Sequence, residues 1–371
     1  MQETTKKLTN RQANYDLLRI ICTIAVIIIH VSAPYKDAYT DTKDPYKCHI
    51  ISTTLYNTLT RFAVPCFMML SGALLLSNEK NKDYKFFYKK TLVNIGIPTF
   101  IFSILYFLYR IAVVSARIFL NGESYRAYVD PVKSLIKGSP YYHMWYLYTL
   151  IGVYLFIPVL LRIKEDIGEK TFAIFSWIVF CVSMASGFTS SFLLNWSISK
   201  VVCYIGYVLI GYQITRMTHK KGNFKGILCI VFAMLALLFL SYIQYNHTID
   251  LIAEKDEKYS LNGNFSPIVI IASLLIFVGF SFLRMNSKRL VRLSNDTFLI
   301  YLFHAGVWNI ISNVWFKVNG GKSNPVYTIP LGIIIVFFVS WGLGFIYSKL
   351  WEALDKKRGI NVKFCKIFKL N

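Results

Sequence analysis

The sequence predicts an all-α polytopic membrane protein with about ten transmembrane helices and both termini in the cytoplasm. Three observations support this fold class. Hydrophobic residues make up 55% and charged residues 16% of the 371 residues, whereas soluble domains carry about 25% charged residues. The apolar residues gather in segments of about twenty residues, the length that crosses a hydrocarbon core as a helix. The basic residues, in turn, are concentrated between alternate segments.

Ten apolar segments follow one another along the chain, and we expect one helix from each. They cover residues 16–35, 55–77, 92–115, 143–161, 171–189, 197–215, 226–245, 266–283, 297–316 and 327–348. No small-residue cleavage site follows the first segment, so we expect it to be a helix of the mature protein rather than a signal peptide. Residues 1–371 are therefore expected to form a single transmembrane domain, with a cytoplasmic N-terminus (1–15) and a basic cytoplasmic tail (349–371).

The distribution of charge predicts the orientation. With the N-terminus inside, the cytoplasmic segments hold 26 of the 41 Lys and Arg residues and the outer loops hold 11. This excess is the positive-inside pattern of membrane proteins. The net charge of +22 is then explained by topology and by contact of the basic tail with anionic lipid head groups. A nucleic-acid partner is not needed to account for it.

Several classes of protein are not supported by the sequence. Five of the seven cysteines fall inside apolar segments, so no disulfide framework is predicted. The chain has no CxxC or HExxH pattern, which leaves no local motif for a metal. It also lacks a GxSxG elbow and a Walker-type glycine loop, so neither a soluble hydrolase nor an ATP-driven pump is indicated.

The first apolar segment carries ionisable residues, which are costly in a membrane helix and mark candidate functional positions. Arg19 and His30 are eleven residues apart. At about 100° per residue they return to nearly the same helix face, about 16 Å apart along the axis. Asp16 precedes Arg19 by three residues and is placed to orient it, although a simple ion pair at the membrane interface explains it equally well.

Other segments carry further candidates. Arg61 lies in the second segment, just before Pro65, and we expect the proline to kink that helix. The kink either shapes a polar cavity beside Arg61 or is purely structural. His304 falls mid-membrane in the ninth segment, where it is either a hydrogen-bonded core residue or part of a site. His143 precedes an aromatic pair at the start of the fourth segment, and an aromatic belt at the membrane interface explains much of that position. The remaining histidines are expected in loops: His49, His219 and His247.

Four stretches of the chain together resemble the acyltransferase-3 family of integral membrane O-acyltransferases. The first is Asn14–Ile20, followed by His30 at an R-x10-H spacing. The second runs over Arg61–Gly72, the third over His143–Pro158, and the fourth over Ser294–His304, which resembles the late YLxH segment of the family. The four occur in the expected order and span nearly the full chain.

That resemblance implies a ten-helix enzyme that passes an acyl group, usually acetyl from cytoplasmic acetyl-CoA, to a hydroxyl of a glycan outside the cytoplasm. Succinyl-CoA is the alternative donor. The acceptor would be a cell-surface or lipid-linked saccharide, and the protein a multi-pass protein of a bacterial cell membrane. No bound cofactor or metal is implied. No long soluble extension follows the last segment, so a second transfer step would fall to a separate protein.

The chemistry assigns a role to each candidate. A sugar hydroxyl needs a base to remove its proton during attack, and imidazole has a suitable pKa. We therefore expect His30 to be the general base, with an acetyl-imidazole intermediate as the variant. Arg19 would bind the CoA phosphates, oriented by Asp16. Arg61 would bind donor phosphate or stabilise the thioester oxyanion. The family pattern adds Tyr301 and His304 along the acceptor or thioester path.

Two other functions remain compatible with the sequence. Polar residues in a ten-helix bundle also mark the pathway of a transporter, which would move a small polar substrate or a glycan intermediate without consuming CoA. A non-catalytic assembly partner in polysaccharide export would tolerate the loss of His30. Acyl transfer, in contrast, requires CoA turnover that collapses without His30.

Overall fold

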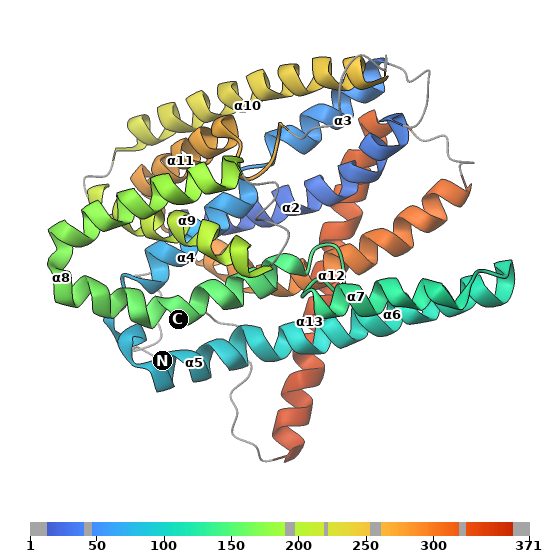
Figure 1. Ribbon diagram of the computed structural model, residues 1–371, viewed down its shortest axis with the longest axis horizontal. Coiled ribbons are helices and arrows are strands. Elements are labelled where there is room, and N and C mark those ends of the chain that lie inside the picture. The colour runs from blue at the N-terminus through green and yellow to red at the C-terminus, as the bar shows by residue number, and fades with distance from the viewer. Residues whose placement is uncertain are drawn as a thin grey trace. The chain divides into compact units, whose positions relative to one another are not determined.

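The computed structural model describes residues 13–40, 47–189, 197–218, 222–252, 261–318 and 324–358. Over these ranges the chain forms helices joined by short turns, without a β-strand (Figure 1). The all-α expectation is therefore confirmed. The α-helices are α2 (Ala13–Thr40), α3 (Lys47–Leu59), α4 (Ala63–Leu75), α5 (Tyr84–Thr91), α6 (Ile97–Asn121), α7 (Val129–Ile136), α8 (Trp145–Thr189), α9 (Ser197–Met217), α10 (Asn223–Ile252), α11 (Pro267–Phe282), α12 (Lys288–Val318) and α13 (Pro325–Arg358).

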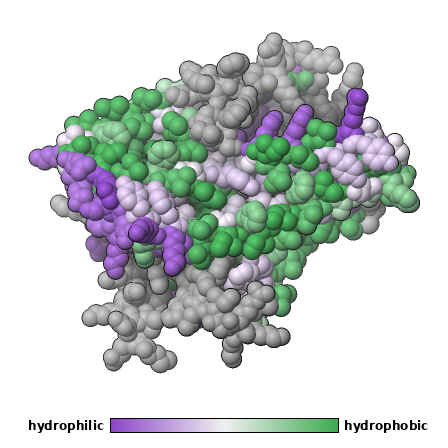
Figure 2. Space-filling model, turned by 60° about the horizontal axis from the view of Figure 1, so that its bottom comes forward, coloured by the Kyte–Doolittle hydropathy of each residue, from purple (hydrophilic) through white to green (hydrophobic). Residues whose placement is uncertain are grey.

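Seven helical stretches within the described residues are long and apolar enough to cross a membrane. They are Ala13–Tyr35, His49–Leu75, Tyr84–Asn121, Trp145–Ala185, Asn223–Leu251, Lys288–Trp315 and Pro325–Ala353. In Asn223–Leu251 the mean hydropathy is 2.7, yet only 28% of the apolar window is buried inside the protein. Figure 2 shows apolar residues over much of the visible surface. Such exposed apolar area fits contact with lipid and would be a liability in water.

The fourth and fifth predicted segments lie in the two limbs of α8. Gly168 separates them, because its φ of 74° and ψ of 162° are not helical. Glycine adopts a positive φ without the steric cost that a Cβ would add. Figure 1 shows the sharp bend between the two limbs. The predicted connection at 162–170 therefore exists as one glycine hinge between otherwise continuous helical turns.

The second predicted segment is interrupted, but the break differs from the expected kink at Pro65. Helix α3 ends at Leu59, α4 begins at Ala63, and a turn over 60–62 joins them. Pro65 lies in the first turn of α4, where a missing N–H costs no helical hydrogen bond. Its ring would clash with the carbonyl four residues earlier, that of Arg61, in a continuous helix. The proline thus displaces the break towards Arg61.

Several helices run beyond the predicted apolar segments. The expected outer loop at 36–54 is largely helical, because α2 extends to Thr40 and α3 starts at Lys47. The expectation that His49 and His247 are loop residues is wrong: they lie in α3 and α10, and His247 is buried. His219 lies outside the described residues. Hydrophobicity marks the part of a helix that meets lipid, whereas the backbone hydrogen bonds continue into polar residues.

By its internal contacts the chain divides into two compact units, one of residues 1–70 and 213–358 and one centred on 71–212. In the first unit, α2 packs against α3, α12 and α13, and α10 lies beside α11 (Figure 1). Apolar side chains of three helices form a buried cluster there. It contains Ile27, Val31 and Tyr35 of α2, Ile300, Val307 and Trp308 of α12, and Ile329 and Val336 of α13. This packing fixes α2 against α12.

In the second unit, α4 and α9 approach closely at Gly72. A Cβ added to Gly72 would lie 1.8 Å from the backbone oxygen of Val208. No side chain fits at that distance, so the two backbones must separate if Gly72 is replaced. Small residues allow this kind of close helix packing in membrane proteins.

We expect Gly72→Ala to destabilise the protein by about 1–3 kcal/mol, because overpacking forces backbone shifts. Thermal unfolding of the purified protein in detergent measures the effect as a lowered Tm. Gly342→Ala is the matched control, since a Cβ there meets nothing within 4 Å. Equal Tm values for wild type and Gly72→Ala would contradict the close α4–α9 contact.

Candidate functional site

The packing of α2 on α12 brings two histidines together. The ring centroids of His30 and His304 are 5.3 Å apart, with an angle of 32° between the ring planes. His30 is half-buried, and His304 is fully buried. The two residues are 274 positions apart in sequence, so only the tertiary structure joins them. A pair of imidazoles inside a membrane helix bundle is a candidate site for proton transfer.

One hydrogen bond sets the orientation of His304. Its Nδ1 lies 2.5 Å from the backbone oxygen of Tyr301, one turn earlier in α12. Because a carbonyl oxygen only accepts, Nδ1 carries the proton in this bond, and a neutral ring then has a basic Nε2. The Tyr301 ring also packs on His304, with centroids 5.3 Å apart. The i, i+3 spacing of these residues thus places both on the helix face that meets His30.

Arg61 is held at the turn between α3 and α4 by Asn57. Its Nε donates to Asn57 Oδ1 at 3.0 Å, and its Nη2 donates to the same oxygen. The same Asn57 side chain donates through Nδ2 to Ser32 Oγ at 3.1 Å and to the Ile29 carbonyl oxygen at 3.4 Å, on either side of His30 in α2. The turn therefore delivers a guanidinium to the neighbourhood of the two histidines, next to the break that Pro65 imposes.

Asp16 and Arg19 form a separate group near the start of α2. Arg19 Nη1 is 3.8 Å from Asp16 Oδ1 and donates to Ser294 Oγ of α12 at 3.2 Å. Asp16 is buried, and the Arg19 side chain keeps 13% of its surface exposed. Arg19 and His30 thus both meet α12, at positions ten residues apart on that helix. The eleven-residue spacing in the sequence indicates this shared face.

The predicted residues accordingly fall into two groups along α2. Asp16 and Arg19 lie at its start, and His30 lies about 16 Å further along the axis, beside His304. Tyr301 packs on His304, and Arg61 is linked through Asn57 to the turn that carries His30. One helix therefore carries a cationic end and an imidazole end, and α12 accompanies it along this length.

Sequence reasoning missed the polar residues that hold the imidazole end together. Asn57 is buried in α3 and bonds to Arg61, Ser32 and Asn262. The signal that points to it is an asparagine four residues before an arginine inside an apolar segment, the spacing of neighbours on one helix face. No motif marks Asn262, which reaches Asn57 from 205 residues away.

His143 belongs to the second unit and is enclosed by aromatic rings rather than lying in an open interfacial belt. It is buried, and its ring centroid lies 5.1 Å from that of Tyr106 and 5.8 Å from that of Tyr141. The aromatic surroundings of the sequence prediction are present, but they bury the imidazole.

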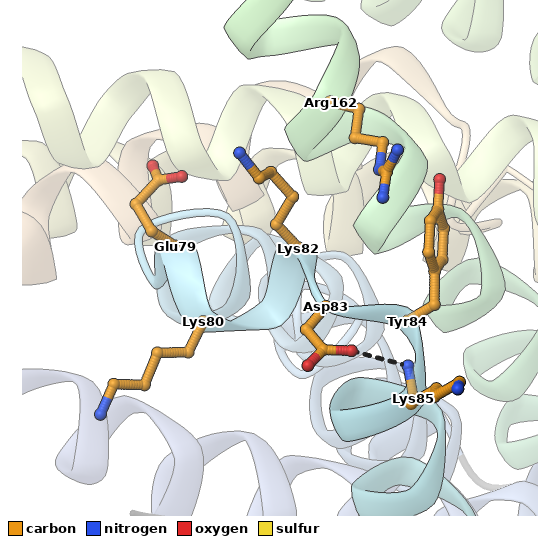
Figure 3. A pocket seen from close by; sticks show the side chains of 7 residues that line it. All are labelled: Glu79, Lys80, Lys82, Asp83, Tyr84, Lys85 and Arg162. Carbon is orange, nitrogen blue, oxygen red and sulfur yellow. Dashed lines mark hydrogen bonds between the residues drawn. The ribbon is translucent and has the colours of Figure 1, made fainter.

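A surface pocket of about 530 Å³ lies in the second unit, within the segments 78–91 and 162–170 that the sequence places in the cytoplasm. Figure 3 shows its seven lining residues, Glu79, Lys80, Lys82, Asp83, Tyr84, Lys85 and Arg162. The Arg162 guanidinium lies over the Tyr84 ring, and Lys82 pairs with Glu165 at 2.5 Å. The pocket contains none of the predicted site residues. Over the described part of the chain, no group of three His, Cys, Asp or Glu side chains is arranged to hold a metal.

Comparison with known proteins identifies a family. Residues 12–345 match the family model of the acyltransferase 3 domain, described as an acyltransferase domain. No curated protein and no solved structure matches the chain. The matched range contains every predicted site residue and six of the seven membrane-length helical stretches in full. It also covers the seventh stretch, Pro325–Ala353, as far as residue 345. The chain belongs to the acyltransferase 3 family, and it is a multi-pass membrane enzyme that transfers acyl groups.

Proposed function

We propose that this enzyme is an O-acyltransferase that moves an acyl group, most simply acetyl, from cytoplasmic acyl-CoA to a hydroxyl of a cell-surface or lipid-linked glycan. The observation that carries the proposal is the contact between His30 and His304, with ring centroids 5.3 Å apart inside the bundle. Acyl transfer to a hydroxyl requires a base at the reacting oxygen, and this pair is placed to supply one.

The proposal includes a topology of ten spans with both termini in the cytoplasm of a bacterial cell. Ten helical stretches match the ten predicted segments: the two limbs of α8, the six other membrane-length stretches, and the helices α9 and α11. The excess of Lys and Arg in alternate loops supports the orientation. In this arrangement Arg19 lies towards the cytoplasm and His30 deeper in the membrane.

The reaction can be written with the chain's own groups. His30 accepts the proton of the acceptor hydroxyl while its oxygen attacks the thioester carbonyl. The resulting tetrahedral oxyanion collapses, the carbon–sulfur bond breaks, and the sulfur leaves with the proton that His30 returns. Arg61 is proposed to stabilise the oxyanion with its positive charge. His304 and Tyr301 are proposed to line the path of acceptor or thioester beside His30.

The cationic end of α2 is proposed to bind the nucleotide part of the donor. A guanidinium matches phosphate geometry better than an ammonium does, and the contact with Asp16 orients Arg19. The flexible pantetheine arm of CoA would then span the distance of about 16 Å along α2 to His30. Asp16, buried beside Arg19, is a supporting residue in this scheme.

We expect His30→Ala to lower the acceptor-dependent release of CoA by about 10²–10⁴-fold, because the general base is lost. The measurement is thiol release by purified protein in lipid, with acetyl-CoA and an added saccharide acceptor. His49→Ala, a histidine near the start of α3, is the control and keeps wild-type turnover. Substrate flux without CoA consumption in wild type would instead identify a transporter.

His304→Ala should lower kcat by about 10–10²-fold while the KM for acyl-CoA changes little, since His304 touches the base rather than the nucleotide end. Steady-state kinetics over a range of acyl-CoA concentrations separates the two constants. A higher KM with an unchanged kcat would place His304 outside the reaction centre.

Arg19→Gln should show the opposite pattern, a KM for acyl-CoA raised by about 10-fold or more with kcat largely kept, because a charge-assisted phosphate contact is lost. The difference in KM between Arg19→Gln and wild type should be smaller with dephospho-CoA thioesters, which lack one phosphate, and at raised salt, which screens the contact. Arg292→Gln, at an exposed position of α12, is the control. A fall in kcat alone would contradict a donor-binding role.

A further inference from the structure

Asn57 connects three separate parts of the first unit through one buried amide. Its Oδ1 accepts from Nε and Nη2 of Arg61 and from Nδ2 of Asn262, the last at 3.3 Å. Its Nδ2 donates to Ser32 Oγ at 3.1 Å and lies 3.4 Å from the Ile29 carbonyl oxygen. The side chain is 1% exposed. Both its oxygen and its nitrogen are thus used, as the burial of an amide requires.

These partners flank the proposed base. Ile29 and Ser32 lie immediately before and two residues after His30 on α2, so the amide group of Asn57 ties Arg61 to the turn that carries the imidazole. Within an apolar bundle the lost donor or acceptor of a buried amide has no water to replace it. The network therefore holds the guanidinium in one place relative to His30.

The partner of Arg61 is neutral. Among the described residues, the hydrogen bonds of its guanidinium go to Asn57, and no carboxylate forms an ion pair with it. Two other cations of the chain show the alternative, since Arg19 is paired with Asp16 and Lys164 with Glu79. A carboxylate would bind a guanidinium more strongly than an amide does, but it would also cancel the charge. An amide positions the cation and leaves its charge uncompensated.

We propose that Asn57 is a positioning residue that holds Arg61 beside His30 through a neutral amide, so that the full charge of Arg61 acts on the thioester oxyanion. This inference rests on the proposed acyl transfer. It predicts that kcat falls more when Arg61 is bound by a carboxylate that cancels its charge than when the side chain that positions Arg61 is removed.

Asn57→Asp and Asn57→Ala make that comparison. Aspartate has nearly the same shape and keeps an acceptor for both N–H groups of Arg61, but forms an ion pair with it. We expect Asn57→Asp to lower kcat by about 10²–10³-fold, the effect of losing one oxyanion contact, with the KM for acyl-CoA close to wild type. The Tm should fall no further than in Asn57→Ala, because both variants lose the Nδ2 donor to Ser32. Asn57→Ala leaves Arg61 charged but misplaced, and it should lower kcat by about 10-fold. Asn313→Asp, at an exposed position near the outer end of α12, controls for an added carboxylate and should keep wild-type kcat.

A double-mutant cycle with Arg61→Gln distinguishes positioning from a general structural role. Because Asn57 acts through Arg61, Asn57→Ala should lower kcat little further in the Arg61→Gln background, whereas independent structural effects would add. Additive losses, or an Asn57→Asp variant as active as Asn57→Ala or more so, would overturn the proposal. The cycle uses Asn57→Ala because this variant introduces no charge.

The His30→Ala variant is measured in parallel, so that the failure of this inference can be told from the failure of the proposed function. If wild type transfers acyl groups in a His30-dependent way and the Asn57 variants are as active as wild type, only this inference is refuted. If the wild-type protein shows no transfer, the proposed function is refuted as well.

Discussion

Polar groups inside an apolar helix bundle must find their partners within the protein, and this constraint organises the first compact unit. Asn57 satisfies Arg61, Ser32 and Asn262 at once, and His304 donates to the carbonyl oxygen of Tyr301 on its own helix. An unsatisfied group at these depths costs more than it would at a wetted surface. The helices α2, α3 and α12 are therefore held in one arrangement by polar contacts as well as by the apolar cluster around Ile27 and Ile300.

This arrangement gives α2 two chemically different ends. At its start, Arg19 is paired with Asp16 and contacts Ser294, which suits a site for a multiply charged donor. About 16 Å further along, His30 faces His304 with a cation nearby that has a neutral partner. An acyl-CoA has the same two-part character, with a charged nucleotide and a distant, uncharged thioester. The match between the helix and the donor links the fold to the proposed reaction.

The sequence predicts the parts of this account that follow from local periodicity. Eleven residues between Arg19 and His30 indicate one helix face, and both residues do meet α12. Ten apolar segments indicate an all-α membrane fold, and helices occupy all of them. The sequence predicts a kink at Pro65, whereas the break between α3 and α4 lies at 60–62, because the proline ring would clash with the carbonyl of Arg61 in a continuous helix. Periodicity gives the face of a helix but not its neighbour, so the His30–His304 contact and the Asn57–Asn262 bond required the tertiary packing.

The central claim is that His30 drives acyl transfer onto a saccharide outside the cytoplasm, and mass spectrometry of surface glycans tests it most directly. Cells carrying the wild-type gene, the His30→Ala variant or no copy would be compared for O-acyl mass increments. The account predicts an increment with wild type only, and its mass identifies the acyl group as acetyl or succinyl. Equal acylation in all three strains would contradict the account and would favour transport over catalysis.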